Sequence, residues 1–135
     1  MAYGIKVVVG ESWEVVLGRV RDALADQGFE VLTELDLSGT LSARLGVEMR
    51  PQVVLGVSQP ELTYAALQAE PSVGVLLPWH LVVRAEDDHT TVVEAANLQF
   101  LVALTANRSL EPVVAEASRR LAAAIQSLTP VTSNL

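Results

Sequence analysis

Residues 12–37, SWEVVLGRVRDALADQGFEVLTELDL, change from a helical to a strand-like hydrophobic period at Gly28. Four apolar residues before this glycine recur at helical spacing behind Ser12: Trp13, Leu17, Val20 and Leu24. After it, apolar or β-branched residues alternate with acids: Phe29, Val31, Thr33, Leu35 and Leu37 against Glu30, Glu34 and Asp36. The stretch therefore predicts an α-helix, a turn, and a half-buried strand with a solvated acidic face.

The residues on either side of this stretch predict a complete α+β domain. We expect further strands at residues 3–9, 52–58, 73–85 and 90–95, and further helices at 38–45, 60–70, 98–105 and from Ser109 onward. The last helix is long, and its apolar stripe is Leu110, Val114, Ala117, Leu121, Ala124 and Leu128. A helical connection joins strand 53–57 to the strand from Val73, which favours a parallel crossover. We predict one domain over residues 1–135, a mixed sheet of about five strands, helices packed on one face, and a loose tail at 130–135.

Composition excludes several function classes. The 135 residues contain no cysteine, so disulfides, thiolate metal sites and cysteine catalysis are excluded. A net charge of −7 without a basic run argues against nucleic-acid binding. The longest apolar stretch, residues 73–83, contains Pro78 and His80 and is far short of the ~20 residues that span a bilayer. We therefore expect a cytoplasmic protein that binds neither nucleic acid nor membranes, and a homodimer because half of the residues are hydrophobic.

Four residues form the candidate ligand site: Ser58, Gln59, Trp79 and His80. If strands 53–57 and 73–85 are parallel, these residues converge at one sheet edge, beside the helix that Pro60 begins. A helix N-terminus attracts anions, and Trp79 favours apolar surface, so the expected ligand is a small anion with an apolar body. The alternative is structural: a strand-to-helix turn that needs a cap, and a bulky apolar residue that fills the sheet edge.

A catalytic role has weaker support in the residues. His80 as base and Ser58 as nucleophile or donor would suit a minor hydrolase or isomerase, but Ser58 lacks the second glycine of a nucleophile elbow and no third acid is apparent. Glu34 and Asp36 fit a solvated strand face, and the acidic turn before His89 fits ordinary turn chemistry. We expect no catalytic residues, no metal and no cofactor, and favour a binding or assembly module.

Three stretches carry a resemblance to a known family: residues 28–36 (GFEVLTELD), residues 50–60 (RPQVVLGVSQP) and residues 76–80 (LLPWH). In order and spacing they resemble the prokaryotic domain-of-unknown-function family three hundred and two. The resemblance implies a curved sheet with helices against it, similar to the fold of TATA-binding proteins, and no established activity. Many relatives place cysteine where Ser58 and Trp79 stand here, and asparagine where His80 stands. This chain has no cysteine and cannot carry out any chemistry that requires such a thiol pair.

Overall fold

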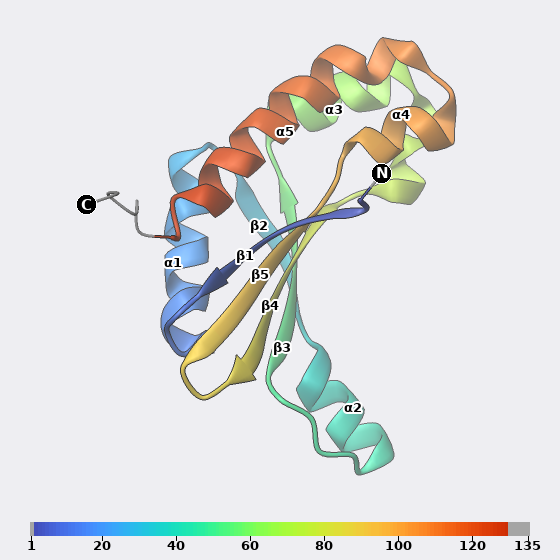
Figure 1. Cartoon of the computed structure of the whole chain (residues 1–135). Helices are drawn as coiled ribbons and strands as arrows, with labels where there is room; N and C mark the ends of the chain where they lie inside the picture. The colour runs from blue at the N-terminus through green and yellow to red at the C-terminus, as the bar shows by residue number, and fades with distance from the viewer. Residues whose placement is uncertain (1, 130–135) are drawn as a thin grey trace, which may run out of the picture.

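The computed structural model describes residues 2–129 as a single α+β domain with one five-stranded sheet (Figure 1). The strands are β1 (Gly4–Val9), β2 (Glu30–Asp36), β3 (Gln52–Ser58), β4 (Trp79–Asp87) and β5 (Thr90–Ala96). Their order across the sheet is β1-β5-β4-β3-β2, and every neighbouring pair is antiparallel. The expected tail at 130–135 lies outside the described residues.

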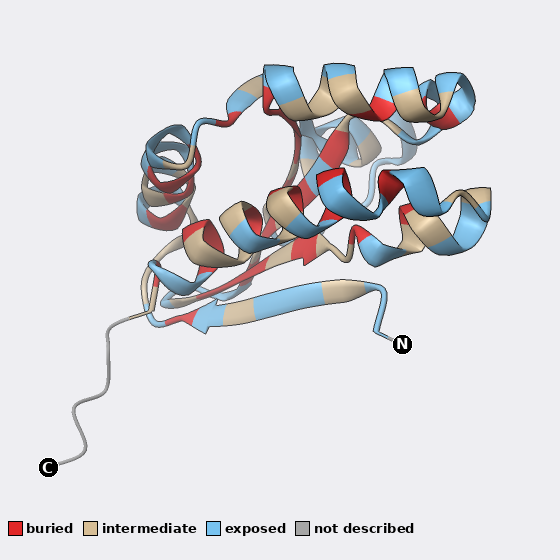
Figure 2. Cartoon of the chain, turned by 90° about the horizontal axis from the view of Figure 1, so that it is seen from above, coloured by how far each residue is buried: buried red, intermediate tan, exposed pale blue. Residues whose placement is uncertain are grey.

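Helices and strands alternate along the chain as far as β4, which is followed directly by β5 and then by the last two helices. The helices are α1 (Trp13–Asp26), α2 (Leu37–Leu45), α3 (Pro60–Ala69), α4 (Gln99–Thr105) and α5 (Glu111–Gln126), with 3₁₀ segments η1 (Pro71–Leu76) and η2 (Arg108–Leu110). Helices α1 and α5 pack against one face of the sheet and against each other. Buried positions gather on the sides of the helices that are turned toward the sheet (Figure 2). Within residues 2–129, no helix is long and apolar enough to cross a membrane.

The long C-terminal helix follows its predicted stripe closely. All six apolar positions, from Leu110 to Leu128, are buried in the core. In α1 the buried side is rotated slightly from the prediction, because Val16 and Ala23 are buried with Val20 and Leu24. The spacing of apolar residues therefore predicts which side of each long helix meets the sheet.

The prediction of a mixed sheet is wrong, because β3 and β4 are antiparallel. The connection between them is long enough for a crossover, but length permits a crossover without requiring one. Residues 73–76, expected to open a strand, belong to η1 (Pro71–Leu76) instead, and β4 begins only at Trp79. Helix α3 and η1 pack together at the end of the sheet, and the chain then returns beside β3 in the opposite direction.

The predicted alternation in β2 is interrupted by a β-bulge. The register with β3 shifts between Val31 and Thr33, so Leu32 has no partner residue. A bulge adds one residue and reverses which side the following residues face. Leu35, expected in the core, is 46% exposed, and Glu34 forms an ion pair with Arg21 of α1.

Helix α2 stands apart from the other helices, at the far end of β3 from α3 (Figure 1). Asp36 caps it by accepting a hydrogen bond from the Gly39 N–H at 2.9 Å, and this bond lowers the pKa of Asp36. Gly46 ends the helix with a φ of 67°, as predicted. None of the nine residues of α2 is buried within the described chain.

Candidate functional site

The end of β3 and the start of β4 lie side by side, as the sequence analysis expected, but for a different reason. In the antiparallel register, Val57 lies opposite Trp79 and Gly56 opposite His80. The carboxyl end of one strand therefore meets the amino end of the next. The two segments of the predicted site are neighbours at one end of the sheet.

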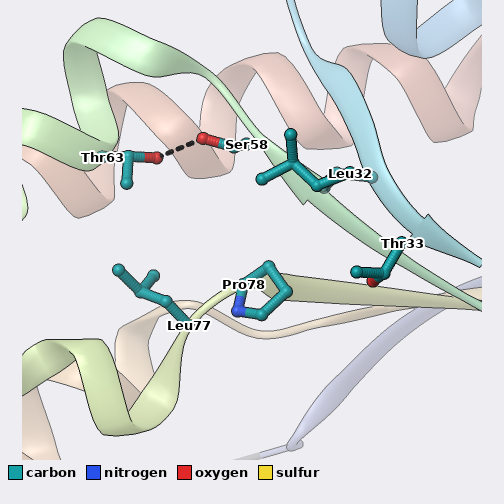
Figure 3. Close-up of a pocket in the computed structure, with 7 residues that line it drawn as sticks. Leu32, Thr33, Ser58, Thr63, Leu77 and Pro78 are labelled. Carbon is teal, nitrogen blue, oxygen red and sulfur yellow. Dashed lines mark hydrogen bonds between the residues drawn. The ribbon is translucent and has the colours of Figure 1, made fainter.

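A cavity of about 280 Å³ opens at this end of the sheet (Figure 3). Its seven lining residues come from β2, β3, α3 and the segment before β4: Leu32, Thr33, Val57, Ser58, Thr63, Leu77 and Pro78. None of these side chains is charged. The hydroxyl oxygens of Ser58 and Thr63 are hydrogen-bonded at 2.7 Å. The pocket is therefore a small, mainly apolar cavity with the hydroxyl side chains of Thr33, Ser58 and Thr63 in its wall.

Gly56 makes this pocket possible. A Cβ atom at position 56 would lie 2.2 Å from Thr33 Oγ1 and 2.7 Å from Pro78 Cγ. Glycine inside a strand is typical of places where other chain segments approach closely. Only glycine lets Thr33 and Pro78 both lie against β3, where they form two walls of the cavity. The Leu77–Pro78 peptide bond is cis.

Gln59 belongs to the frame of the site rather than to the pocket wall. Its Oε1 accepts a hydrogen bond from the Leu62 N–H at 2.9 Å, and its Nε2 donates to the carboxylate of Glu61. Gln59, which the sequence suggested as a ligand contact, is the N-cap residue of α3. Because that cap already occupies one free N–H of α3, the helix offers an anion less than its position alone suggests.

Trp79 and His80 point to opposite sides of the sheet. Trp79 is buried and packs edge-to-face on Phe29, with ring centroids 6.3 Å apart. Its indole Nε1 is buried without a hydrogen-bond partner in the described structure. His80 is exposed on the other side of the sheet, opposite Gly56.

The four predicted residues are neighbours but do not line one cavity. Ser58 lines the 280 Å³ pocket, whereas Trp79 and His80 line a neighbouring cavity of about 160 Å³ bounded by α4. Pro78 lines both and so lies between them. Ser58 is bonded to Thr63 and not to His80.

The sequence did not indicate Leu32, Thr33, Val57 or Thr63 as lining residues. Gly56 was the available signal, because a glycine within an apolar strand indicates that another segment lies close to it. Which segments approach depends on the antiparallel register and on the bulge in β2. Neither feature could be read from the spacing of residues.

Groups suited to metal binding are not assembled in the described part of the chain. No cluster of three histidine, aspartate or glutamate side chains occurs within residues 2–129. At the β4–β5 turn, Asp87 accepts a hydrogen bond from the His89 backbone N–H at 2.8 Å, which lowers the pKa of Asp87. That contact is the turn chemistry that the sequence favoured.

Comparisons with known proteins agree with this architecture. A family model described as "Domain of unknown function DUF302" matches residues 5–128. The chain is also similar to the crystal structure of an uncharacterized conserved DUF302 protein from Bacillus stearothermophilus, with 26% identity and a TM-score of 0.88. That match covers 96% of this chain and all of the other. None of the curated proteins compared with the chain matches it.

Proposed function

The chain belongs to the DUF302 family, and we propose that it is a non-catalytic binding module, a homodimer that holds a small molecule at the Ser58 end of its sheet. The observation that carries the proposal is a cavity with a mainly apolar lining that includes the hydrogen-bonded hydroxyls of Ser58 and Thr63. Binding sites typically combine an apolar lining with a few polar groups that orient the ligand. This cavity has that composition.

The hydroxyl pair defines the polar part of the ligand. In the Ser58–Thr63 hydrogen bond one hydroxyl donates and the other accepts, so the accepting hydroxyl keeps its own proton. That proton is available to a ligand oxygen. A small carboxylic acid, bound as its anion, provides such an acceptor, whereas an ammonium group provides only donors.

The cavity walls define the rest of the ligand. At about 280 Å³ the pocket is at the lower limit of ligand sites, which span roughly 300–1,000 Å³. Leu32, Leu77 and Pro78 offer apolar contact. We therefore expect a compact, branched aliphatic body of a few carbons, such as that of 4-methylpentanoate.

The four predicted residues have separate tasks in this proposal. Ser58 contacts the ligand, Gln59 caps the helix that carries Thr63, and Trp79 anchors the start of β4 in the core. His80 lies in the neighbouring hollow across Pro78, where its imidazole N–H provides a further hydrogen-bond donor for an anion.

Thermal unfolding with three matched compounds tests the proposed ligand. We expect 4-methylpentanoate to raise the Tm, the alcohol of the same skeleton to raise it less, and the amine to leave it unchanged. Ser58→Ala should weaken the stabilisation by the acid, whereas Ser109→Ala, at an exposed position outside the pocket, should not. Equal effects of acid and amine, or no effect of Ser58→Ala, would contradict the proposal.

The enzymatic alternative assigns His80 as base and Ser58 as nucleophile or donor. The hydrogen bond of Ser58 to Thr63 and the separate cavities of Ser58 and His80 support binding over catalysis. Hydrolysis of a small ester that is lost in both Ser58→Ala and His80→Ala would favour the alternative instead.

The homodimer has its own test. Apolar side chains remain exposed on both edge strands, including Val8 of β1 and Leu35 of β2. Uncovered apolar surface and open sheet edges are typical of proteins that associate. Light scattering on a size-exclusion peak at micromolar concentration should give twice 14.4 kDa, and a mass of 14.4 kDa across a dilution series would contradict the proposal.

A further inference from the structure

Within residues 2–129, one face of the sheet has no helix on it. Val9, Val83 and Val93 are buried on the side where α1 and α5 pack. By alternation, the residues between them face the other side, and the strand register aligns them into two cross-strand rows. The first row is Val8, Val92, Arg84 and Gln52, and the second is Lys6, Glu94, Val82, Val54 and Leu35. We call this surface the open face.

The open face is only partly polar. Val8 is 56% exposed, Leu35 is 46% exposed, and Val54 and Val82 between them are half-buried. Lys6 lies opposite Glu94 in the register, so one basic and one acidic residue are neighbours there. Arg84 carries one guanidinium nitrogen that is buried without a hydrogen-bond partner in the described structure. These are the features of a surface that another layer covers.

Residues 37–50, which we call the arm, carry apolar side chains that are exposed. The helix of the arm, α2, places Leu37, Leu41 and Leu45 on one side, at intervals of four residues. Leu45 is 68% exposed, and Val47 and Met49 are also exposed just beyond it. A helix with one apolar side normally buries that side against another element. Within the described residues, the element that α2 contacts most is β3, to which it is connected.

We propose that two copies of this chain associate so that α2 of each covers the open face of the other. This inference rests on the proposed homodimer and assigns its surface. A two-fold axis uses the same patch on both copies, and a patch that joins an uncovered sheet face to an uncovered helix is self-complementary. The arm extends beyond the end of its own sheet (Figure 1) and so reaches outward toward a neighbour.

Charge favours a second copy as the occupant. The open face and the arm together carry four basic residues, Lys6, Arg44, Arg50 and Arg84, and two acids, Glu48 and Glu94. The chain as a whole has nine basic and sixteen acidic residues, so the excess of negative charge lies outside this patch. Two copies with a net charge of −7 each can meet there without bringing their acidic surfaces together.

The area that a stable dimer interface buries is larger than the open face alone can provide. Five strands about 4.8 Å apart and about 20 Å long cover roughly 500 Å². A stable interface buries about 800 Å² on each partner. A helix of the length of α2 adds on the order of 100–150 Å², and the apolar segment after Gly46 adds more. Sheet and arm together approach the area of a stable dimer, whereas the sheet alone does not.

Cross-linking between single-cysteine variants tests the proposed contact, because the natural chain has no cysteine to interfere. Leu45→Cys on the arm is mixed with Val82→Cys at the middle of the open face, and a short bis-maleimide is added. Leu104→Cys is the matched control, because Leu104 is also 68% exposed near the end of a helix. We expect a cross-linked species with Leu45→Cys and Val82→Cys, and none with Leu104→Cys and Val82→Cys.

Light scattering of charge variants completes the test. Leu45→Glu should raise the dissociation constant of the dimer about tenfold or more, whereas Leu104→Glu should leave it unchanged within about twofold. A dimer that survives Leu45→Glu and gives no arm-to-face cross-link would overturn this inference and leave the homodimer standing. A wild-type chain that stays monomeric would overturn both.

Discussion

The two ends of strand β3 belong to one seven-residue element but have opposite surroundings. At the carboxyl end, Val57 and Ser58 are buried, and segments of β2, α3 and the residues before β4 surround a cavity. At the amino end, Gln52 follows an arm whose helix has no buried residue. One sheet therefore has two kinds of surroundings at the two ends of the same strand. At the carboxyl end of β3, the surrounding segments enclose a pocket of the size of a small molecule. At the amino end, the projecting arm has a larger exposed surface, of the kind that suits a protein partner.

The largest effect that tests this comparison is expected at Trp79. Trp79→Ala should lower the free energy of unfolding by about 3–5 kcal/mol, because it removes a buried aromatic side chain and its contact with Phe29. Leu45→Ala at the arm should change it by less than about 0.5 kcal/mol in dilute, monomeric protein. Urea titration measures both values. Similar losses at the two positions would mean that the arm is packed within the single chain.

A second, intermediate effect is expected at Gly56. Gly56→Ala should cost about 1–3 kcal/mol of unfolding free energy, because the new methyl group meets Thr33 and Pro78. Gly18→Ala is the control, since a Cβ at that position in α1 meets nothing within 4 Å. It should stabilise the chain by about 0.5–1 kcal/mol, as expected for glycine in a helix. Effects of the same sign would refute the close approach at Gly56.

A third effect separates binding from stability at His80. His80→Ala should change the free energy of unfolding by less than about 0.5 kcal/mol, because the side chain is exposed. The affinity for 4-methylpentanoate should fall, though less than in Ser58→Ala. Calorimetry of unfolding and of binding gives both numbers. A large fall in Tm with unchanged affinity would make His80 a structural residue.

The smallest effect concerns the helix layer, away from both ends of β3. Arg119 and Arg120 lower the pKa of Glu116 from 4.5 to about 2 by hydrogen bonding to its carboxylate. A lowered pKa in the folded state stabilises the fold above pH 4.5, and this contribution is lost as the pH falls toward 2. The difference in Tm between wild type and Glu116→Gln should therefore shrink over that range. A difference that is constant with pH would contradict the assigned cause.

Much of the fold could be predicted from the sequence, because long helices and hairpins are specified locally. The stripe from Leu110 to Leu128, the turn at Gly28 and the β4–β5 hairpin follow from spacing and turn residues that act over a few positions. The direction of β4 relative to β3 does not follow from such local signals. This direction depends on where α3 and η1 pack, because a connection of that length allows both parallel and antiparallel pairing.

The candidate site was predicted in part for the same reason. Ser58 and Trp79 are neighbours in the observed antiparallel pair, where β4 starts at Trp79. They would also be neighbours in a parallel pair with a longer second strand. Their proximity could therefore be predicted even though the predicted topology was wrong. The contributions of Thr33 and Leu32 depend on a one-residue bulge. A bulge leaves no pattern in a single sequence beyond an interrupted alternation.

Native mass spectrometry of the purified chain with 4-methylpentanoate tests the central claim most directly, because one spectrum reports both binding surfaces of the sheet. The account predicts a species of twice the chain mass that carries two molecules of the acid, and Ser58→Ala should remove the acid while Leu45→Glu should remove the second chain. A spectrum that contains only free 14.4 kDa monomer would contradict the account.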